Sequence, residues 1–313
     1  MSISSLSIKQ KAKKLGFQKI GIAKAKEYGE DQKNLDSWLQ EGRNGTMDWI
    51  KKRKDERGNI FNYFPEAKSV ISVGLNYYVG KNQNDLYSDY KFSNYAWGDD
   101  YHNVLKKRLF ELLDWIKRNS NKVKGLACVD TAPIMEKVWA REAGLGWIGK
   151  HTNLITKDYG SWIFLGELIL DIELDYDLPF YEDLCGSCTA CLDSCPTDAI
   201  DSYKIDAKKC ISYLTIEHRG EFEDRNINLD SWIYGCDICQ EVCPWNKKFE
   251  EASDLDEFQP RTSIVNYNND DWNNLSEKNY TNLFTKSPVK RTKYKGLKRN
   301  INQNKKEQSS CRK

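Results

Sequence analysis

The sequence predicts an α+β fold, with a helix-and-strand domain over residues 1–175 and a cysteine-rich domain over residues 176–255. Up to about residue 175, segments with helical periodicity alternate with segments rich in β-branched and aromatic residues, which is typical of helices packed on one sheet. After it, eight of the ten cysteines lie between positions 185 and 243. The acidic, proline-containing stretch DIELDYDLPFYEDL marks the boundary, and a polar, basic segment follows over residues 256–313.

The first elements follow from composition and spacing. Residues 1–60 are expected to be mostly helical. Residues 68–79, KSVISVGLNYYV, are expected to form a strand because they are rich in β-branched and aromatic residues. A loop is expected over residues 80–100. A helix follows it, since apolar side chains recur there at helical spacing: Leu105, Leu109, Leu112, Leu113 and Ile116.

Four further elements are predicted before the boundary. They are a strand over 122–130, a helix over 132–144 that ends at Gly144, and strands within 151–156 and 161–174. The cysteine-rich domain is expected to have little regular structure. The Asn-rich, polar sequence from residue 250 onward leaves open whether the residues after about 302 are ordered.

Charge is unevenly distributed along the chain. The net charge is +2, but residues 286–313 contain eleven Lys and Arg against one acid, Glu307. This segment therefore carries +10 and residues 1–285 carry −8. A basic end on an acidic body favours a polyanionic partner bound at that end, whereas a solvated tail explains the same charges without any partner.

The sequence predicts a cytoplasmic protein that does not enter a membrane. The N-terminal stretch MSISSLSIKQKAKKLGF has no apolar run typical of a signal peptide. The most apolar segment, WIFLGELIL, contains Glu167 and is too short to span a bilayer. In a reducing compartment, clustered cysteines indicate metal binding more often than disulfides.

The cysteines match the spacing that holds [4Fe–4S] clusters in bacterial ferredoxins, C-x2-C-x2-C-x3-C followed by proline. CGSCTACLDSCP has this spacing, and its fourth cysteine is expected to bind a second cluster. CDICQEVCP supplies the second set, with Cys210 standing 26 positions before Cys236 as a departure from the simple pattern. The crossed assignment puts Cys185, Cys188, Cys191 and Cys243 on the first cluster, and Cys195, Cys210, Cys236 and Cys239 on the second.

Structural zinc is the alternative for these cysteines, since paired C-x2-C spacings also bind zinc. The tight run of four cysteines before a proline is not typical of zinc sites, so the sequence favours two [4Fe–4S] clusters. Of the remaining cysteines, Cys128 lies in a predicted strand and is expected to be a small buried side chain. Cys311 is expected to be a free thiol.

Two features near the end of the first domain have competing interpretations. GLGWIG (144–149) matches G-x-G-x-x-G, but a helix precedes it and a strand follows, which argues against a dinucleotide site. Its glycines would instead let the backbone approach a flat ligand. Asp130 follows a predicted strand, where catalytic carboxylates occur, but capping the helix that begins near Pro133 is the commoner role of such an aspartate.

Longer stretches of the sequence resemble the epoxyqueuosine reductase family. The resemblance rests on VDTAPIMEKVWAREAGLGWIGKHTNLI, GSWIFLGEL, the two cysteine runs, ISYLTIEHRG and SPVKRTKYKGLKRN, in this order, from about residue 5 to 302. It implies reduction of the epoxide of epoxyqueuosine at the wobble position of tRNA, the last step of queuosine biosynthesis. It also implies two [4Fe–4S] clusters and cobalamin, in a cobalamin-binding, nitroreductase-like sheet domain followed by a ferredoxin-like domain.

The resemblance further implies roles for single residues. Asp130 matches the proton donor of the family. The residues expected to line the corrin or substrate pocket are Arg57, Tyr95, Tyr101, His102, Asp130, Lys150, His151, Asn153 and Ser161. Because the resemblance implies cobalamin bound without a protein histidine on cobalt, His102 and His151 are expected to have hydrogen-bonding or structural roles.

The partner implied by the resemblance is the anticodon arm of tRNA. Many members continue into a HEAT-like helical repeat domain, whereas this sequence ends at Lys313, so binding is expected to rest on the core and the basic segment. The expected phosphate contacts are Arg219, Arg291, Lys298 and Arg299. An external donor such as a flavodoxin or ferredoxin is expected to load the clusters, and the chain is expected to act as a monomer.

Two other functions fit the cysteine pattern. A cobalamin-dependent reductive dehalogenase acting on a small molecule would use the same cofactors, but it has no need of a basic end. A non-catalytic iron–sulfur module for electron transfer or RNA binding is the second. The roughly 175 residues before the clusters argue against a simple carrier, because they indicate a substrate or cofactor domain.

Overall fold

The computed structural model describes residues 3–222 and 227–310 and is built around a four-stranded sheet. The strand order is β1 (Lys19–Lys24), β2 (Ser69–Asn76), β7 (Ile163–Leu170) and β4 (Gly125–Cys128). Each neighbouring pair is antiparallel, and every residue of the central strand β2 is buried. An antiparallel sheet with helices on its faces is an α+β arrangement, as predicted.

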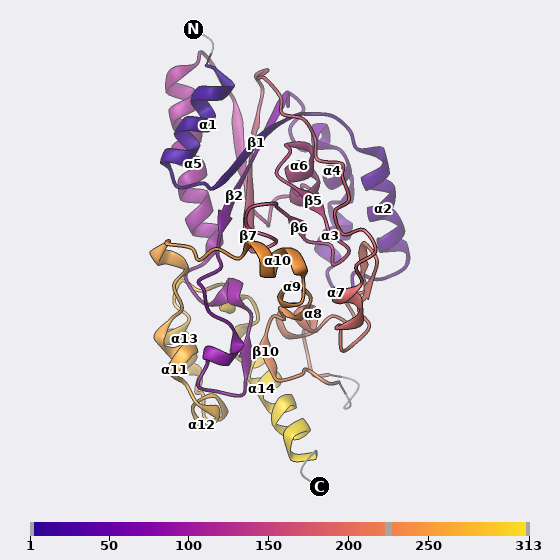
Figure 1. The fold of residues 1–313 in the computed structure, drawn as a ribbon, viewed down its shortest axis with the longest axis vertical. Helices are drawn as coiled ribbons and strands as arrows, with labels where there is room; N and C mark the ends of the chain where they lie inside the picture. Colours follow the sequence, from indigo (N-terminus) through magenta and orange to yellow (C-terminus); the bar gives the residue numbers. More distant parts are fainter. Residues whose placement is uncertain (1–2, 223–226, 311–313) are drawn as a thin grey trace.

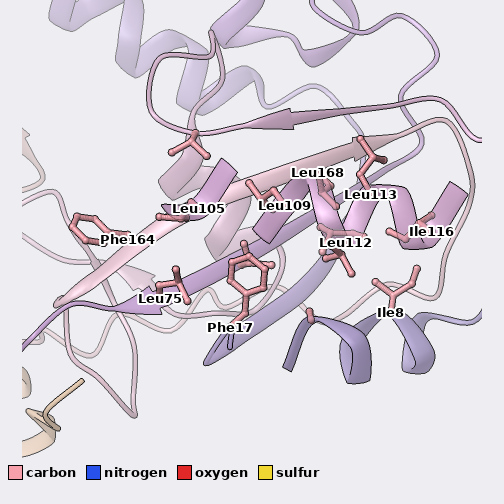
Figure 2. Packing of buried hydrophobic residues seen from close by; sticks show 14 of the residues in the cluster. Ile8, Phe17, Leu75, Leu105, Leu109, Leu112, Leu113, Ile116, Phe164 and Leu168 are labelled. Carbon is pink, nitrogen blue, oxygen red and sulfur yellow. The ribbon is translucent and has the colours of Figure 1, made fainter. Parts of the chain in front are cut away.

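One face of the sheet is covered by α1 (Ser5–Lys14) and α5 (Tyr101–Asn119) (Figure 1). The five apolar residues that predict α5 are all buried and point toward the sheet and α1 (Figure 2). Burying each of them contributes roughly 1.5–3 kcal/mol relative to leaving it exposed. The side chain of Asp100 caps the first turn of α5 by accepting from the backbone N–H of His102.

The opposite face is covered by α6 (Glu136–Glu142), where Trp139 and Ala140 pack on Val70 and Ile169 of the sheet. The helical conformation that begins with α6 ends at Gly144, as predicted. Its φ is +77°, and the backbone N–H groups of residues 144 and 145 bond to carbonyls of the last turn, which is a Schellman motif. Cys128 is buried in this layer, as expected from its position in a strand.

The prediction that residues 1–60 are mostly helical is wrong for β1. The segment KIGIAK pairs with β2 over all six residues, and three of them are buried. Its lysines and glycine give little β-signal, so the strand depends on its partner rather than on its own composition. The helices α2 (Gly29–Gln40), α3 (Asp48–Lys52) and α4 (Lys54–Gly58) fill the rest of this region.

The cysteine-rich region contains only short elements, as predicted. They are α7 (Ala190–Asp193), β8 (Ile200–Asp201), β9 (Lys204–Ile205), α8 (Ile211–Ile216), β10 (Trp232–Tyr234), α9 (Ile238–Glu241) and α10 (Pro244–Phe249). Two of these helices begin directly after a cysteine: Cys210 precedes α8, and Cys243 precedes α10, which starts with Pro244. Within the first domain, the two short strands β5 (Trp147–Ile148) and β6 (Leu154–Ile155) pair with each other before β7.

The segment after residue 250 is folded, which its polar composition did not indicate. Its helices are α11 (Thr262–Asn266), α12 (Asn269–Asn273), α13 (Glu277–Leu283) and α14 (Lys293–Ser310), shown below the sheet in Figure 1. They share a hydrophobic cluster with Trp97 and with Tyr234 of β10. In addition, β10 pairs in parallel with β3 (Lys91–Phe92), within the region expected to be a loop. The cluster therefore crosses the predicted boundary at residue 255.

The asparagines of α14 explain why the polar composition of this segment did not indicate that it is folded. Asn300 and Asn304 are buried, and their side-chain amides donate to the carbonyls of Ile233 and Trp232 at 2.9 and 3.0 Å. Polar residues here satisfy the backbone of β10 instead of facing water. None of the described helices is long and apolar enough to cross a membrane. Cys311 lies outside the described residues.

Candidate active site

A cavity of about 1080 Å³ lies between the sheet, the cysteine-rich region and the C-terminal helices. Its wall includes the ends of β2 and β7, the starts of α5 and α6, and the 3-10 turn η5 (Pro288–Arg291). Seven of the nine residues expected to line a pocket lie in this wall: Tyr95, Tyr101, His102, Asp130, His151, Asn153 and Ser161. Segments far apart in the sequence thus bring these side chains to one place.

Lys150 and Arg57 do not line the cavity. The ammonium group of Lys150 donates to the carbonyls of Gly186 and Cys188 at 2.6 and 3.0 Å, so it supports the first cysteine loop. Placing it in the pocket is therefore a wrong prediction. Arg57 lies one layer behind the wall, where it stacks over the cavity residue Trp49 and donates to the carbonyl of Ile134.

Asp100, His102 and Asp130 form a hydrogen-bonded chain at the cavity. The His102 ring contacts Asp100 through Nδ1 at 2.7 Å and Asp130 through Nε2 at 3.0 Å. The Asp130 side chain is about half exposed to the cavity, at 49%. This hydrogen-bonded chain of side chains therefore presents the Asp130 carboxylate to a ligand and holds the Asp100 carboxylate at the start of α5.

The charges in this chain place a proton on the imidazole at neutral pH. Burial lowers the pKa of His102, but the hydrogen bonds and charges of Asp100 and Asp130 outweigh it and raise the pKa to about 9. Burial raises the pKa of Asp130, yet His102, Arg291 and Arg57 together hold that pKa below its usual value. An imidazolium then donates from both ring nitrogens, one to each carboxylate.

The helix-cap interpretation of Asp130 is wrong. The residue before α6 is Met135, and no side chain caps that helix. Asp130 instead has a φ of +48°, in the left-handed region that non-glycine residues seldom adopt. Its backbone N–H donates to the carboxylate of Glu136, which holds this turn against α6.

His151 is a neutral ring in the cavity wall. Burial, helped by the charge of Lys137, lowers the pKa of His151 to about 4. Its Nδ1 accepts from the backbone N–H of Asn153 at 3.2 Å, so the ring proton is on Nε2. That Nε2 is buried and has no hydrogen-bond partner among the described residues, which leaves it as a donor for a ligand.

The nine described cysteines are free thiols, and eight of them gather in two adjoining sets. Cys191 has Cys185, Cys243 and Cys188 as its charged neighbours, whereas Cys236 has Cys239 and Cys210. The Cys195 thiol is near enough to Cys210 and Cys239 to add to the rise in pKa that burial gives each. Cys191 is also a charged neighbour of Cys239, so the two sets adjoin and the crossed assignment stays a prediction. Among the described residues, no three His, Cys, Asp or Glu side chains form a site for a single metal ion.

The second cysteine set borders the cavity directly. Cys210, Cys236 and Cys239 all line its wall. The neighbouring Gln240 donates to the Tyr77 hydroxyl at 3.0 Å and accepts from the Asn153 side chain at 2.9 Å. Electrons held at this cysteine set would therefore enter the same cavity that the protonated His102–Asp130 pair lines.

Comparison with known proteins decides the family. A model described as "Epoxyqueuosine reductase QueG, DUF1730" matches residues 57–131, and one described as "4Fe-4S double cluster binding domain" matches residues 184–246. The epoxyqueuosine reductase of Cellulophaga algicola is 45% identical over 94% of this chain and 95% of its own. The chain belongs to the epoxyqueuosine reductase family.

Solved structures of the epoxyqueuosine reductase family have the same fold. A crystal structure of an epoxyqueuosine reductase with an epoxyqueuosine-modified tRNA-Tyr stem loop is 29% identical, with a TM-score of 0.85 over 95% of this chain and 80% of that one. The enzyme from Bacillus subtilis, solved with its catalytic aspartate loop swung out of the active site, is 28% identical, with a TM-score of 0.84 and the same coverage.

The basic residues predicted to contact tRNA differ in their environments. Arg291 lines the cavity and pairs with Glu217 through two bonds of 2.7 Å, and Arg219 is exposed beside it, donating to the Arg291 carbonyl. Lys298 donates to the carbonyl of Asn273. Arg299 is only 7% exposed.

The prediction of a phosphate contact is wrong for Arg299. Its guanidinium donates to three backbone carbonyls, those of Leu214, His218 and Gly220, so it joins α14 to α8. The two remaining N–H groups donate to Asn300 Oδ1, so this buried guanidinium has no donors left to meet a phosphate.

Sequence reasoning missed Asp100, Glu136 and Gln240 in the cavity wall. Asp100 had a signal, because an aspartate just before an amphipathic helix is a typical cap. Glu136 lies inside the stretch that carries the family resemblance but looks like an ordinary helix residue. Gln240 follows a cysteine ligand candidate, and nothing in the local pattern shows that it reaches Tyr77.

Proposed function

We propose that this chain reduces epoxyqueuosine in tRNA to queuosine. Membership in the family supports the reaction, and one observation supports the site: an acid chain and a cysteine set face the same cavity. Breaking the epoxide to an alkene and water needs electrons and protons at one place. The cavity offers a source of each.

We assign the two cysteine sets as ligands of two [4Fe–4S] clusters, in the crossed arrangement predicted from the spacing. Cys185, Cys188, Cys191 and Cys243 would hold the first, and Cys195, Cys210, Cys236 and Cys239 the second. The match of residues 184–246 to a double-cluster domain and the grouping of the thiols support this assignment. Because the second set borders the cavity, the second cluster is the one that delivers electrons.

The residues present in the cavity fit cobalamin. Its wall combines aromatic and apolar side chains such as Tyr95 and Leu165 with the unpartnered Nε2–H of His151, which suits a large, flat, amide-bearing ligand. Neither histidine offers a lone pair for cobalt: His102 has both nitrogens engaged, and the unpartnered Nε2 of His151 carries its proton. Bound here, cobalamin would supply a reduced metal centre for opening the epoxide-bearing ring.

The role of Asp130 is to deliver a proton to the departing oxygen. Its carboxylate is ionised while His102 holds the proton, so the proton reaches the substrate through the 3.0 Å bond between them. Substrate binding excludes water from the cavity, which raises the pKa of a carboxyl group and favours this transfer. Asp100 keeps the ring oriented and charged.

The tRNA would bind over the mouth of the cavity. Arg291 and Arg219 lie there with the neighbouring Lys290, and all three are available to phosphates once Arg291 exchanges Glu217 for a phosphate. Lys298 is farther along the same segment. The anticodon arm would thus place its wobble base in the cavity.

The predicted domains then have separate roles. Residues 1–175 form the nitroreductase-like sheet domain that binds cobalamin, residues 176–255 form the ferredoxin-like domain, and residues 256–313 contribute the basic rim. An external flavodoxin or ferredoxin would load the clusters of a monomer. A tRNA substrate would place this reaction in the cytoplasm.

The test is an anaerobic assay with a low-potential reductant, cobalamin and epoxyqueuosine-containing tRNA. Nucleosides from the digested tRNA are separated and identified by mass spectrometry. We expect queuosine to appear and epoxyqueuosine to disappear. Unchanged epoxyqueuosine, with both clusters and cobalamin present in the protein, would exclude the proposed function.

A further inference from the structure

The proposed reaction consumes two protons, and the Asp100–His102–Asp130 chain stores one. Both carbon–oxygen bonds of the epoxide break, a carbon–carbon double bond forms, and the oxygen leaves as water after taking up two protons and two electrons. The clusters supply the electrons. The imidazolium of His102 supplies one proton through Asp130. A second proton must come from elsewhere.

Glu136 is a further acid in direct contact with Asp130. Its Oε1 accepts the backbone N–H of Asp130, and its side chain lines the same cavity. Burial, followed by the charge of Asp130, raises the pKa of Glu136 to about 7. This carboxyl group therefore holds a proton more readily than an exposed glutamate does, directly behind the residue that meets the substrate.

A second buried carboxyl group, that of Glu167 on strand β7, lies behind Glu136. It is fully buried in β7, and both of its carboxyl oxygens lack hydrogen-bond partners among the described residues. Its register partners are Ser72 on β2 and Cys128 on β4, so its side chain shares the sheet face that carries α6. Burial, followed by the charge of Glu136, raises the pKa of Glu167 well above its usual value.

A buried carboxyl without partners is stable only when it carries its proton. Protonated Glu167 therefore stands beneath Glu136, and an ionised Glu136 would in turn raise the cost of ionising Glu167. The two groups form a pair in which at least one proton is retained. The titratable and charged groups around Glu136 are Arg57, Tyr101, His102, Cys128, Asp130, Lys137 and Glu167.

Of these neighbours, Lys137 has its ammonium group occupied elsewhere. It donates to the carbonyl of Thr152 and to the side chain of Asn153 at 2.9 and 3.0 Å. Arg57 likewise donates to the carbonyl of Ile134. No described cation forms a salt bridge with Glu136 or Glu167, so the nearby charges of Lys137, His102 and Arg57 act on the pair without direct contact.

We propose that Glu136, backed by the buried Glu167, is a second proton store that opens directly onto the cavity beside Asp130. Glu136 holds the Asp130 turn in its left-handed conformation and releases its proton to the cavity that it lines after the first proton has been used. This inference rests on the proposed function, since it assigns the source of the second proton in that reaction.

The first test is the pH profile of Glu136→Gln. A glutamine keeps an oxygen to accept the Asp130 N–H but cannot store a proton. In the unaltered chain, the single-turnover rate with pre-reduced clusters should fall about tenfold from pH 6 to pH 8, as Glu136 loses its proton. In the variant, the rate should be at least about tenfold lower at pH 6 and should not change over this range.

Glu142→Gln is the matched control. Glu142 is also a buried carboxyl on α6, but it pairs with Arg141 and lies outside the cavity wall. Its variant should retain the tenfold fall between pH 6 and pH 8. The proposal is overturned if Glu136→Gln also retains that fall, or if it matches the unaltered rate at pH 6.

A second measurement needs no turnover. The infrared carbonyl absorption of protonated carboxyl groups is recorded at pH 6 and pH 8 in the cofactor-loaded protein without tRNA. We expect a difference signal that disappears in Glu136→Gln and persists in Glu142→Gln. Absence of a Glu136-dependent signal would overturn the proton store even if queuosine is formed. Its presence without queuosine formation would place the failure in the proposed function.

Discussion

Asp130 is held in the cavity by contacts on both sides of its own backbone. The His102 ring bonds to its carboxylate, and Glu136 accepts its backbone N–H. A φ of +48° costs an aspartate about a kilocalorie per mole, and these contacts offset it. The position of this single side chain therefore depends on three separate segments.

Replacing Asp130 by Asn should preserve both cofactors and the affinity for tRNA but remove the proton donor. General acid catalysis contributes roughly a hundred- to ten-thousand-fold, so we expect a loss of this size in the single-turnover rate. Rapid-quench assays with nucleoside analysis measure it. Asp114→Asn, at an exposed position on α5, is the matched control and should turn over normally. Normal turnover in Asp130→Asn would remove this residue from the mechanism.

At the scale of elements, α14 shows how a polar helix becomes part of the core. The side chain of Asn300 donates to the carbonyls of Thr215 and Ile233 at 2.8 and 2.9 Å, and it is fully buried. This one amide therefore joins α14 to α8 and β10. Those are the elements that carry Cys210 and lead into Cys236.

Asn300→Ala should lower the free energy of unfolding by about 1–3 kcal/mol, because it leaves the buried Ile233 carbonyl without its side-chain donor, whereas Thr292 still donates to the Thr215 carbonyl. Asn302→Ala, two residues along on the exposed side of the same helix, should change it by less than about 0.5 kcal/mol. Denaturant titration of both variants under anaerobic conditions gives the comparison. Equal effects of the two changes would contradict the account of α14.

The elements that sequence reasoning predicted are those whose own residues specify them. The spacing of Leu105, Leu109 and Leu112 is enough to specify the buried face of α5, and the apolar runs around β2 and β7 are enough to specify central strands. β1 escaped prediction because its pairing with β2, not its composition, makes it a strand. The C-terminal helices escaped because buried asparagines look like surface residues in a sequence.

The residues of the candidate site also divide into those that the sequence predicted and those that it did not. The eight cysteines could be grouped from spacing alone, and the thiols lie near one another in the structure, while the crossed assignment stays a prediction. Asp130 needed the family resemblance, since spacing favoured a helix cap. Lys150 and Arg299 were misplaced because a cation near a motif was read as a ligand contact, whereas both bond to backbone carbonyls. Only the folded chain shows Glu136 behind Asp130.

For the whole molecule, the cavity lies where the three predicted regions meet. The sheet domain contributes Asp130, the cysteine-rich region contributes Cys239, and the C-terminal segment contributes Arg291. Figure 1 shows the C-terminal helices packed below the sheet and beside the short helices of the cysteine-rich region. Lys290 and Arg291, at the start of the basic segment, thus line the cavity.

Replacing Arg291 by Gln should weaken binding of a tRNA stem loop and make it less sensitive to salt. Loss of one phosphate contact lowers the slope of log affinity against log salt by about one. Fluorescence anisotropy at several salt concentrations measures this slope. Arg118→Gln, at an exposed position in the last turn of α5 and outside the cavity wall, should leave it unchanged. A slope unaffected by Arg291→Gln would exclude this arginine from the tRNA site.

The account depends most on electrons entering the cavity from a pair of iron–sulfur cubes. Iron, acid-labile sulfide and zinc measured on protein purified without oxygen test this directly. We predict about eight irons and eight sulfides per chain, the content of two complete [4Fe–4S] clusters. Roughly one zinc per cysteine set, with negligible iron and sulfide, would contradict it.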